Sequence, residues 1–270
     1  MSRADARPDA YPDAYPEPLS AANHGVGRRR PWADRWGFAA WPCEVCGQWG
    51  GQGLCGDCQA RFVDSQPARC PRCALPGAGG RVCGACLRQP PVFAGCVAAV
   101  TYAFPWDRLV ARLKFQAQPE LAGLLADVLQ PAVAQAAAQS AAWLPAAQIV
   151  LPVPLGPARL AERGYNQAWE LARRLALRQG LPTRPDLLLR LRDTPHQVGL
   201  RRHERERNLR DAMWVDGRAG QLAGRHVALV DDVLTTGGTA AAATLALRAA
   251  GAASVQLWVL ARTPAPADGA

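Results

Sequence analysis

The sequence predicts an α/β fold, with a mostly parallel sheet flanked by helices behind a small cysteine-rich N-terminal module. Between residues 91 and 265, short apolar runs typical of strands alternate with longer runs typical of helices. Between residues 41 and 90, eight cysteines stand among Gly and Pro with little apolar material for a core. The chain has 270 residues, enough for one sizeable core and such an accessory module.

Charge and hydropathy limit the classes of binding partner and the cellular compartment expected for this protein. The formal net charge of +9 suggests an anionic partner such as a nucleotide, pyrophosphate or nucleic acid, without choosing among them. The N-terminus lacks the apolar core of a signal peptide, and no apolar run approaches the roughly 18 residues that span a bilayer. We therefore expect a cytoplasmic protein without membrane insertion.

The chain divides into three parts. Residues 1–40 are expected to be a disordered tail, because they repeat Pro-containing fragments without periodicity. Residues 41–90 form the cysteine module and residues 91–265 the α/β domain. In that domain the expected strands are 97–104, 149–153, 187–191, 227–230 and 255–260, and the expected helices are 106–115, 121–139, 166–179 and 240–250. The arginine-rich segment 192–210 is either a mobile lid or a solvated excursion.

Eight of the nine cysteines form four C-x-x-C pairs, which indicates metal binding rather than disulfides in a chain without a secretion signal. Two such knuckles supply four thiolates to one tetrahedral zinc ion. The matching spacings favour two sequential structural zinc ribbons, although interleaved pairing or a redox role is also allowed. The expected zinc ligands are Cys43, Cys46, Cys55 and Cys58, and Cys70, Cys73, Cys83 and Cys86. Cys96 is expected to be a buried small hydrophobe.

The strongest functional signal is the run 227–239, in which an apolar strand leads into two acids, a Thr/Gly turn and an Ala-rich helix. Asp231 and Asp232 are expected at the carboxyl end of the strand, where open α/β sheets bind their ligands. Two carboxylates can accept hydrogen bonds from a ribose diol and hold a Mg²⁺ shell.

The turn itself carries groups suited to a phosphate. Gly237 and Gly238 let backbone N–H groups face an anion, and the helix presents its positive end there. The rest of the loop, including three hydroxyl donors, consists of Val233, Leu234, Thr235, Thr236 and Thr239. The alternative is an ordinary strand–turn–helix with Thr239 as N-cap, which leaves the doubled acid unexplained.

A second strand ends in Pro152-Val153-Pro154, and Arg163-Gly164-Tyr165-Asn166-Gln167 opens the next helix. Backbone N–H groups and the Arg163 fork there suit pyrophosphate oxygens, although the segment is equally typical of a helix start with a polar cap. Lys114 is the single lysine among 31 basic residues. Its survival suggests a need for a compact ammonium, and chance retention of one lysine explains it equally well.

The loop 231–239 resembles the phosphoribosyl-pyrophosphate (PRPP) loop of type I phosphoribosyltransferases. Together with the cysteine pairs, Leu113-Lys114-Phe115, the segments 152–154 and 163–167, and residues 197–208, it resembles the ComF family over residues 43–262. The resemblance implies a type I phosphoribosyltransferase fold, PRPP binding with Mg²⁺ and, in some bacteria, a link to uptake of single-stranded DNA. It makes Asp231, Asp232 and Arg163 the expected catalytic residues. The expected PRPP contacts are residues 231–239, Pro152, Val153, Pro154 and Lys114.

Two functions follow as hypotheses. The first is an enzyme that transfers the phosphoribosyl group of PRPP to an unidentified acceptor. The second is a single-stranded-DNA-binding protein that responds to PRPP and acts with DNA-uptake proteins, without significant catalysis. Aromatic and basic residues in the cysteine module, such as Trp41, Trp49 and Arg61, suit stacking and phosphate contacts, and they equally suit packing of the module itself.

Overall fold

The computed structural model describes residues 41–51, 53–139, 144–191 and 213–265. The expected N-terminal tail and the arginine-rich segment 192–210 lie outside these residues. The described helices are α2 (Gly56–Gln59), α3 (Gly84–Arg88), α4 (Trp106–Phe115), α5 (Leu121–Gln139), α6 (Pro157–Arg163), α7 (Gln167–Gln179) and α9 (Gly238–Ala249), with a π-helix η1 (Ala60–Asp64) and a 3-10 helix η2 (Gly217–Leu222). The strands are β1 (Trp41–Pro42), β2 (Trp49–Gly51), β3 (Gly95–Thr101), β4 (Ile149–Pro152), β5 (Leu188–Arg190), β6 (Met213–Val215), β7 (His226–Leu234) and β8 (Ser254–Arg262).

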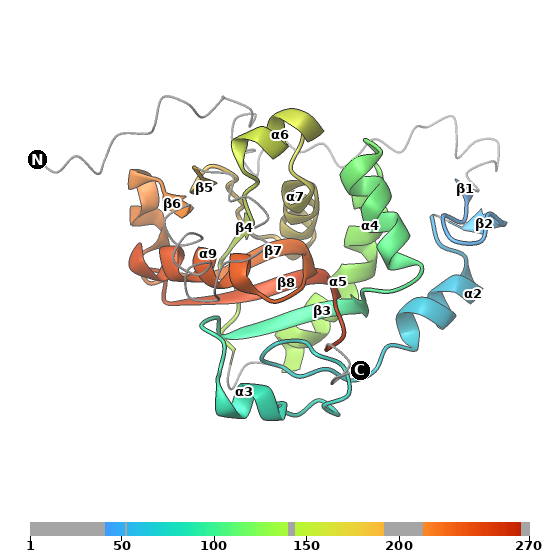
Figure 1. Ribbon diagram of the computed structural model, residues 1–270, viewed down its shortest axis with the longest axis horizontal. Helices are drawn as coiled ribbons and strands as arrows, with labels where there is room; N and C mark the ends of the chain where they lie inside the picture. The colour runs from blue at the N-terminus through green and yellow to red at the C-terminus, as the bar shows by residue number, and fades with distance from the viewer. Residues whose placement is uncertain (1–40, 52, 140–143, 192–212, 266–270) are drawn as a thin grey trace, which may run out of the picture.

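The main sheet has four parallel strands in the order β3-β8-β7-β4 (Figure 1). β7 and β8 occupy the centre, with Val227 opposite Val255. Both central strands are almost wholly buried, which explains why they appear in the sequence as nearly continuous apolar runs. Two short antiparallel pairs, β1–β2 and β5–β6, lie outside this sheet. The predicted α/β fold with a mostly parallel sheet is confirmed.

Alternate residues of the sheet point into two separate apolar cores. Ala228 and Val230 of β7 face the core formed with α4, α5 and α7. Val227 and Leu229 face the core formed with α9. Because each strand side chain points to the face opposite that of its neighbours, helices on both faces bury the whole strand. The sheet is therefore a rigid platform whose carboxyl edge positions the residues that follow each strand.

Helix α5 corrects one expectation from composition. By length and composition it could cross a membrane, whereas we expected no apolar run to approach the length of a membrane span. Its buried residues, among them Leu125 and Leu129, belong to the core shared with α4 and α7. The helix is thus explained as a core element of the α/β domain.

The acidic pair corrects another expectation, since the apolar run predicts a strand that ends at Val230. β7 continues to Leu234, so both acids lie inside the strand rather than beyond its end. The reason is β8, which continues beside it: Asp231 pairs with Val259 and Leu234 with Arg262. The end of a strand depends on how far its neighbour extends, which local sequence does not reveal.

Helix α9 begins two residues earlier than predicted. Its N-cap is Gly237, which has a left-handed backbone with φ of 83°, so the interpretation of Thr239 as the N-cap is wrong. The strand predicted at 97–104 runs instead from Gly95 to Thr101, because Pro105 already caps α4. Other predicted boundaries agree with the structure to within a few residues.

Candidate functional site

The segment after β7 has the geometry of an anion-binding loop. Thr235 and Thr236 are exposed, and Gly237 turns the chain into α9. The amide of Ala241 makes a helical bond of 2.8 Å to the Gly237 carbonyl. The amides of residues 238–240 precede this bond and have no acceptor within the helix, as at every helix N-terminus. These N–H groups, the helix dipole and the threonine hydroxyls together suit a phosphate.

The two acids before the loop occupy different environments. Asp232 is 2% exposed and points to the side of the sheet covered by α4, where it forms an ion pair with Lys114. Asp231 accepts a hydrogen bond of 2.9 Å from the Asp232 backbone N–H. Burial of its carboxyl and the neighbouring Asp232 charge raise the pKa of Asp231 well above its ordinary value. The pair therefore offers one carboxylate matched by a cation and one that holds its proton more tightly than usual.

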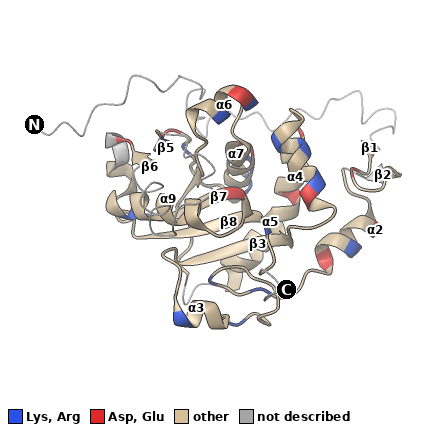
Figure 2. Ribbon diagram, in the orientation of Figure 1, with Lys and Arg blue, Asp and Glu red and all other residues tan. Residues whose placement is uncertain are grey.

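Lys114 reaches this pair from the last turn of α4. Its side chain is 22% exposed, whereas that of Asp232 is 3% exposed. The lysine side chain thus keeps partial contact with solvent while its ammonium meets the buried acid. Figure 2 marks the acidic residues on β7 and the basic residues on α4 and α6. The single lysine of the chain, far from the loop in sequence, lies next to it in space.

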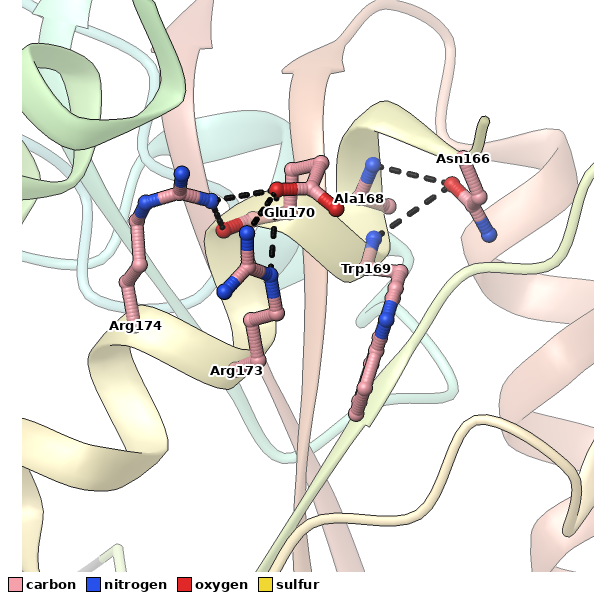
Figure 3. Close-up of polar contacts among 6 residues, drawn as sticks. All are labelled: Asn166, Ala168, Trp169, Glu170, Arg173 and Arg174. Atoms are coloured by element: carbon pink, nitrogen blue, oxygen red, sulfur yellow. Dashed lines mark hydrogen bonds and ion pairs between the residues drawn. The ribbon is translucent and has the colours of Figure 1, made fainter. Parts of the chain in front are cut away.

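The segment between α6 and α7 is a capped helix start, as one of the two interpretations of its sequence held. Asn166 accepts hydrogen bonds from the amides of Ala168 at 2.9 Å and Trp169 at 3.4 Å (Figure 3). The side-chain amide of Asn166 in turn donates to the Val153 carbonyl at 3.0 Å. The cap therefore ties the start of α7 to the turn that follows β4. Figure 3 also shows Glu170 one turn further on, paired with Arg173 and Arg174.

The same segment closes on the end of α4. The Tyr165 hydroxyl donates to the Leu113 carbonyl, and the Arg163 guanidinium lies 5.6 Å from the centre of the Phe115 ring. Arg163 also donates to the Gln167 side chain. Burial lowers the pKa of Arg163, and the charge of Asp232 opposes that shift. Three motifs that the sequence separates, 113–115, 163–167 and 231–232, thus converge on one side of the sheet.

The segment Pro152–Pro154 contributes backbone rather than side chains. Pro152 lies opposite Val230 in the sheet, and the Val153 amide donates to the Val230 carbonyl at 2.8 Å. All three residues are buried. The structure brings them to the neighbouring strand end, beside the acidic segment, with their side chains turned into the protein.

The paired cysteines form two compact groups of four, each made of two C-x-x-C knuckles that are consecutive in the chain. Within each group the four sulfur atoms lie within 4.8 Å of one another, so the pairing is sequential and not interleaved. In the first group Cys46 Sγ lies 3.6 Å from Cys55 Sγ, and in the second Cys73 Sγ lies 3.7 Å from Cys83 Sγ. A zinc tetrahedron with bonds of about 2.3 Å has edges of roughly 3.8 Å, so both all-sulfur groups fit zinc. We call them the first and the second four-cysteine unit.

The first four-cysteine unit packs against α4 and α5. Glu44 pairs with Arg112 at 2.8 Å, and Trp106 donates to the Phe62 carbonyl at 3.3 Å. Phe62 also meets the ring of Phe104 edge to face, with ring centres 5.6 Å apart. Trp41 and Trp49 behave differently: they are 70% and 75% exposed, so packing of the module does not account for them.

The second four-cysteine unit packs against β3 (Figure 1). The Cys96 amide donates to the Pro71 carbonyl at 3.0 Å, and Arg72 donates to the Ala94 carbonyl at 2.9 Å. Cys96 is buried in the core on the α9 side, as expected for a small hydrophobe. Burial raises the pKa of its thiol, which favours the neutral form of this ninth cysteine.

Arg262 is a residue near the site that sequence reasoning missed. It ends β8 and donates to the carbonyls of Leu234 and Thr235 at the start of the loop, at 2.9 and 2.6 Å. The available signal was its place two residues after the predicted strand 255–260. Nothing local distinguishes it from the other arginines of the chain.

Comparison with known proteins agrees with this geometry. Residues 160–268 match the phosphoribosyl transferase domain family. The DNA utilization protein YhgH of Salmonella typhimurium is 37% identical over 212 residues, which cover 78% of this chain and 91% of that protein. Competence protein F of Haemophilus influenzae is 36% identical over 214 residues, covering 78% and 90%. A Bacillus subtilis glutamine PRPP amidotransferase structure is 22% identical over 53% of this chain and 26% of its own, with a TM-score of 0.32, too low to add to the assignment.

Fold and site define a protein with a type I phosphoribosyltransferase domain behind an N-terminal cysteine-rich module of two four-cysteine units. The extent of the sequence match then narrows the class. The chain belongs to the ComF family, together with the YhgH and competence F proteins.

Proposed function

We propose that this protein binds PRPP with Mg²⁺ and transfers its phosphoribosyl group to an acceptor. One observation carries the proposal: the acidic pair on β7 leads directly into a Thr/Gly loop whose left-handed Gly237 opens α9. Carboxylates for a ribose diol and amides for a 5-phosphate therefore follow one another along a single strand–loop–helix unit.

The residues take separate roles along the bound substrate. Asp231 and Asp232 accept hydrogen bonds from the ribose hydroxyls, and residues 233–239 bind the 5-phosphate. Arg163 and Lys114 face the pyrophosphate beside the strand end Pro152–Pro154, whose one amide, that of Val153, is already bonded to the Val230 carbonyl. Both Arg163 and Lys114 lie on the α4 side of the sheet, where Asp232 also points. Cations placed there favour departure of the pyrophosphate by stabilising its developing charge.

Mg²⁺ fits the donor set on this edge, because it prefers carboxylate and phosphate oxygens and keeps several waters. Bound with PRPP, it would supply neutralisation of the pyrophosphate charge. In the transfer, the bond from C1 of the ribose to the pyrophosphate oxygen breaks and a bond from C1 to the acceptor forms, with inversion at C1. The acceptor is expected to attack C1 through the lone pair of a nitrogen, and the proton that this nitrogen loses passes to solvent or to the departing pyrophosphate.

The proposal is tested with isotope-labelled PRPP, MgCl₂ and a panel of nitrogen nucleophiles. Protein-dependent release of pyrophosphate, coupled to a labelled ribosyl product, supports the transferase. The matched inactive protein is the double variant Asp231→Asn with Asp232→Asn, which keeps the size of both side chains. If wild-type protein shows no affinity for PRPP in calorimetry, the loop is only a structural turn and the proposal fails.

A second candidate function is single-stranded DNA binding that responds to PRPP without turnover. It is favoured by the exposure of Trp41 and Trp49 on the β1–β2 hairpin. Two arginine–aromatic pairs lie where the cysteine module packs on α4, with Arg61 5.4 Å from the Phe62 ring centre and Arg108 5.1 Å from that of Phe104. Aromatic faces interleaved with arginines suit unpaired bases and phosphates.

This candidate has its own test. Trp41→Ala with Trp49→Ala should weaken binding of a fluorescent oligonucleotide, by about tenfold for each base stacked. Leu177→Ala, which truncates a comparably exposed apolar residue on α7, is the matched control. Log affinity should fall with log salt by about 0.7 per phosphate contacted. If oligonucleotide affinity changes neither with salt nor with replacement of both tryptophans, this surface is not the binding site. If oligonucleotide affinity depends on PRPP while no pyrophosphate is released, this candidate is favoured over the transferase.

A further inference from the structure

Residues 233–239, which are proposed to bind the 5-phosphate, are called the phosphate loop below. The guanidinium of Arg262 lies between the second four-cysteine unit and the start of this loop. Its Nη1 donates to the Leu234 and Thr235 carbonyls at 2.9 and 2.6 Å. Its Nε donates to the Cys73 carbonyl at 3.1 Å. Cys73 and Arg262 are 189 residues apart in sequence. One side chain therefore joins a cysteine knuckle to the loop proposed to bind phosphate.

At the loop end, these bonds fix the direction in which the chain leaves β7. The Leu234 carbonyl also accepts a bond of 3.1 Å from the Thr263 amide, so the last residue of the strand is held from two donors. Arg262 Nη1 further contacts the Thr263 carbonyl and hydroxyl at 3.0 and 2.8 Å. A planar, permanently charged guanidinium holds such a set of oxygens in one geometry. The amides at the start of α9 follow directly, so their orientation depends on this anchor.

At the other end, the Cys73 carbonyl belongs to a knuckle whose two sulfurs are candidate metal ligands. Ala74, fully buried, takes a left-handed backbone with φ of 56°, and its amide donates to the Cys70 carbonyl at 2.8 Å. Cys70 and Cys73 both contribute sulfur to the second four-cysteine unit, whose geometry fits zinc. A metal held there would hold the knuckle closed and with it the carbonyl that Arg262 contacts.

We propose that Arg262 is a positioning residue through which the second four-cysteine unit orders the phosphate loop. Metal in that unit would then support ligand binding at the loop without touching the ligand. Where PRPP affinity is the readout, the inference rests on the proposed function; where backbone hydrogen exchange is the readout, it does not.

The first arm of the test compares Arg262→Gln with Arg248→Gln. Arg248 also donates its guanidinium to backbone carbonyls, those of Ala252 and Ala253, but beyond the end of α9 and away from the loop. In Arg262→Gln we expect hydrogen exchange of peptides covering 233–243 to become several-fold faster, and PRPP affinity to fall about tenfold. Arg248→Gln should leave both unchanged. Arg262→Lys, which keeps the charge but loses the fork, should fall between Arg262→Gln and wild type.

The second arm tests the link to the metal. Cys70→Ser should lower the zinc content by one per chain, speed exchange of the same peptides and weaken PRPP binding by a similar factor. Combined with Arg262→Gln it should cause little further loss, because both changes break one chain of contacts. If Cys70→Ser does not fold, the Arg262 variants still show by hydrogen exchange of peptides 233–243 whether Arg262 orders the loop.

The outcomes separate this inference from the proposed function. Wild-type exchange and wild-type PRPP affinity in Arg262→Gln would overturn the inference and leave the proposed function standing. Faster exchange in Arg262→Gln, in a protein whose wild type does not bind PRPP, would support the positioning role while the proposed function fails. If the losses of PRPP affinity in Cys70→Ser and Arg262→Gln add up in the double variant, the metal does not act through Arg262.

Discussion

At the scale of single residues, the ion pair between Lys114 and Asp232 couples the stability of the protein to its candidate site. Asp232 is 2% exposed, and its charge is matched by the single lysine of the chain. A buried carboxylate that loses its partner cannot return to water, so the pair contributes to stability as well as to the site. The sequence alone suggests an acid at an open strand edge. Replacing such an acid by a neutral residue would leave the stability of the fold unchanged.

The first prediction concerns the asymmetry of that pair. Lys114→Met should lower the free energy of unfolding by about 1–3 kcal/mol, because it leaves Asp232 charged and buried. Asp232→Asn should cost less, since the Lys114 side chain, 22% exposed, can turn its ammonium toward solvent. Urea unfolding of both variants and wild type measures the difference. Equal costs would mean that the ion pair is exposed in solution.

Lys114→Arg tests whether the site needs an ammonium. The substitution keeps the charge but replaces a compact donor by a planar fork, which should not fit between α4 and the acidic strand in the same way. We expect near-wild-type stability and a PRPP affinity several-fold weaker in calorimetry. Wild-type affinity would assign the survival of this lysine to chance.

The second prediction is a pH dependence centred on Asp231. Its pKa is raised above the unfolded value of about 3.9, so the folded protein holds the proton more tightly than the unfolded chain. Stability from this group is therefore present at low pH and is lost as pH rises through the folded pKa. Ligand binding needs the carboxylate and should strengthen over the same interval. PRPP calorimetry across pH in wild type and Asp231→Asn isolates this effect, because titration of PRPP itself is common to both; identical pH profiles would contradict it.

At the scale of elements, the strand–loop–helix unit of β7 and α9 depends on one backbone conformation. Gly237 has φ of 83°, a region that side chains with a Cβ disfavour. Space is not the limitation, since the nearest atom to an added Cβ would be Leu234 Cδ1 at 3.7 Å. The glycine is therefore favoured at the turn that leads from the loop into α9.

The third prediction follows from this turn. Gly237→Ala should cost roughly 1–2 kcal/mol of stability and weaken PRPP binding by about tenfold or more. Gly224→Ala is the matched control: its φ is 70°, nothing lies within 4 Å of an added Cβ, and it precedes β7 at the opposite end of that strand. The control should show a similar loss in thermal unfolding with unchanged PRPP affinity. An equal loss of affinity in both would show that the effect is global destabilisation.

At the scale of the whole molecule, the cysteine-rich module is integrated with the α/β domain at two places. The first four-cysteine unit pairs Glu44 with Arg112 on α4. The second contacts β3 through the bond from the Cys96 amide to the Pro71 carbonyl and, through Arg262, the loop after β7. Although the module precedes the domain in sequence, each of its halves is therefore fixed to a different part of the domain. Removing metal should affect the domain and not only the module.

The fourth prediction is a zinc content of two per chain, falling to one in Cys55→Ser. Four thiolates per unit supply each ion, and loss of one ligand opens the tetrahedron. Thermal unfolding should shift downward as well, because the first unit is packed on α4 and α5. Cys96→Ala, which removes the cysteine outside both groups, should retain two zinc ions. Elemental analysis below one zinc in freshly purified wild type would contradict the double site.

The sequence by itself determined the features whose parts lie close together in the chain. The parallel α/β class, the helix ranges 106–115 and 121–139, the four C-x-x-C pairs and the acid–Thr–Gly loop were all predictable from spacing and periodicity. Such features are local: a C-x-x-C knuckle or a strand–turn–helix draws its geometry from a few neighbouring residues.

Only the tertiary structure decided the sequential pairing of the cysteines, the extension of β7 past its acids, and the contacts of Lys114 and Arg262. The extension of β7 and the contacts of Lys114 and Arg262 depend on residues far apart in sequence that meet in the fold, whereas the cysteine pairing depends on which two knuckles fold around one site. Lys114 and Asp232 are brought together because α4 covers the face to which alternate residues of β7 point. Arg262 reaches Cys73 because β8 lies beside β3, against which the second unit packs. Periodicity shows which face of an element is buried, but which elements meet is decided by packing of the whole chain.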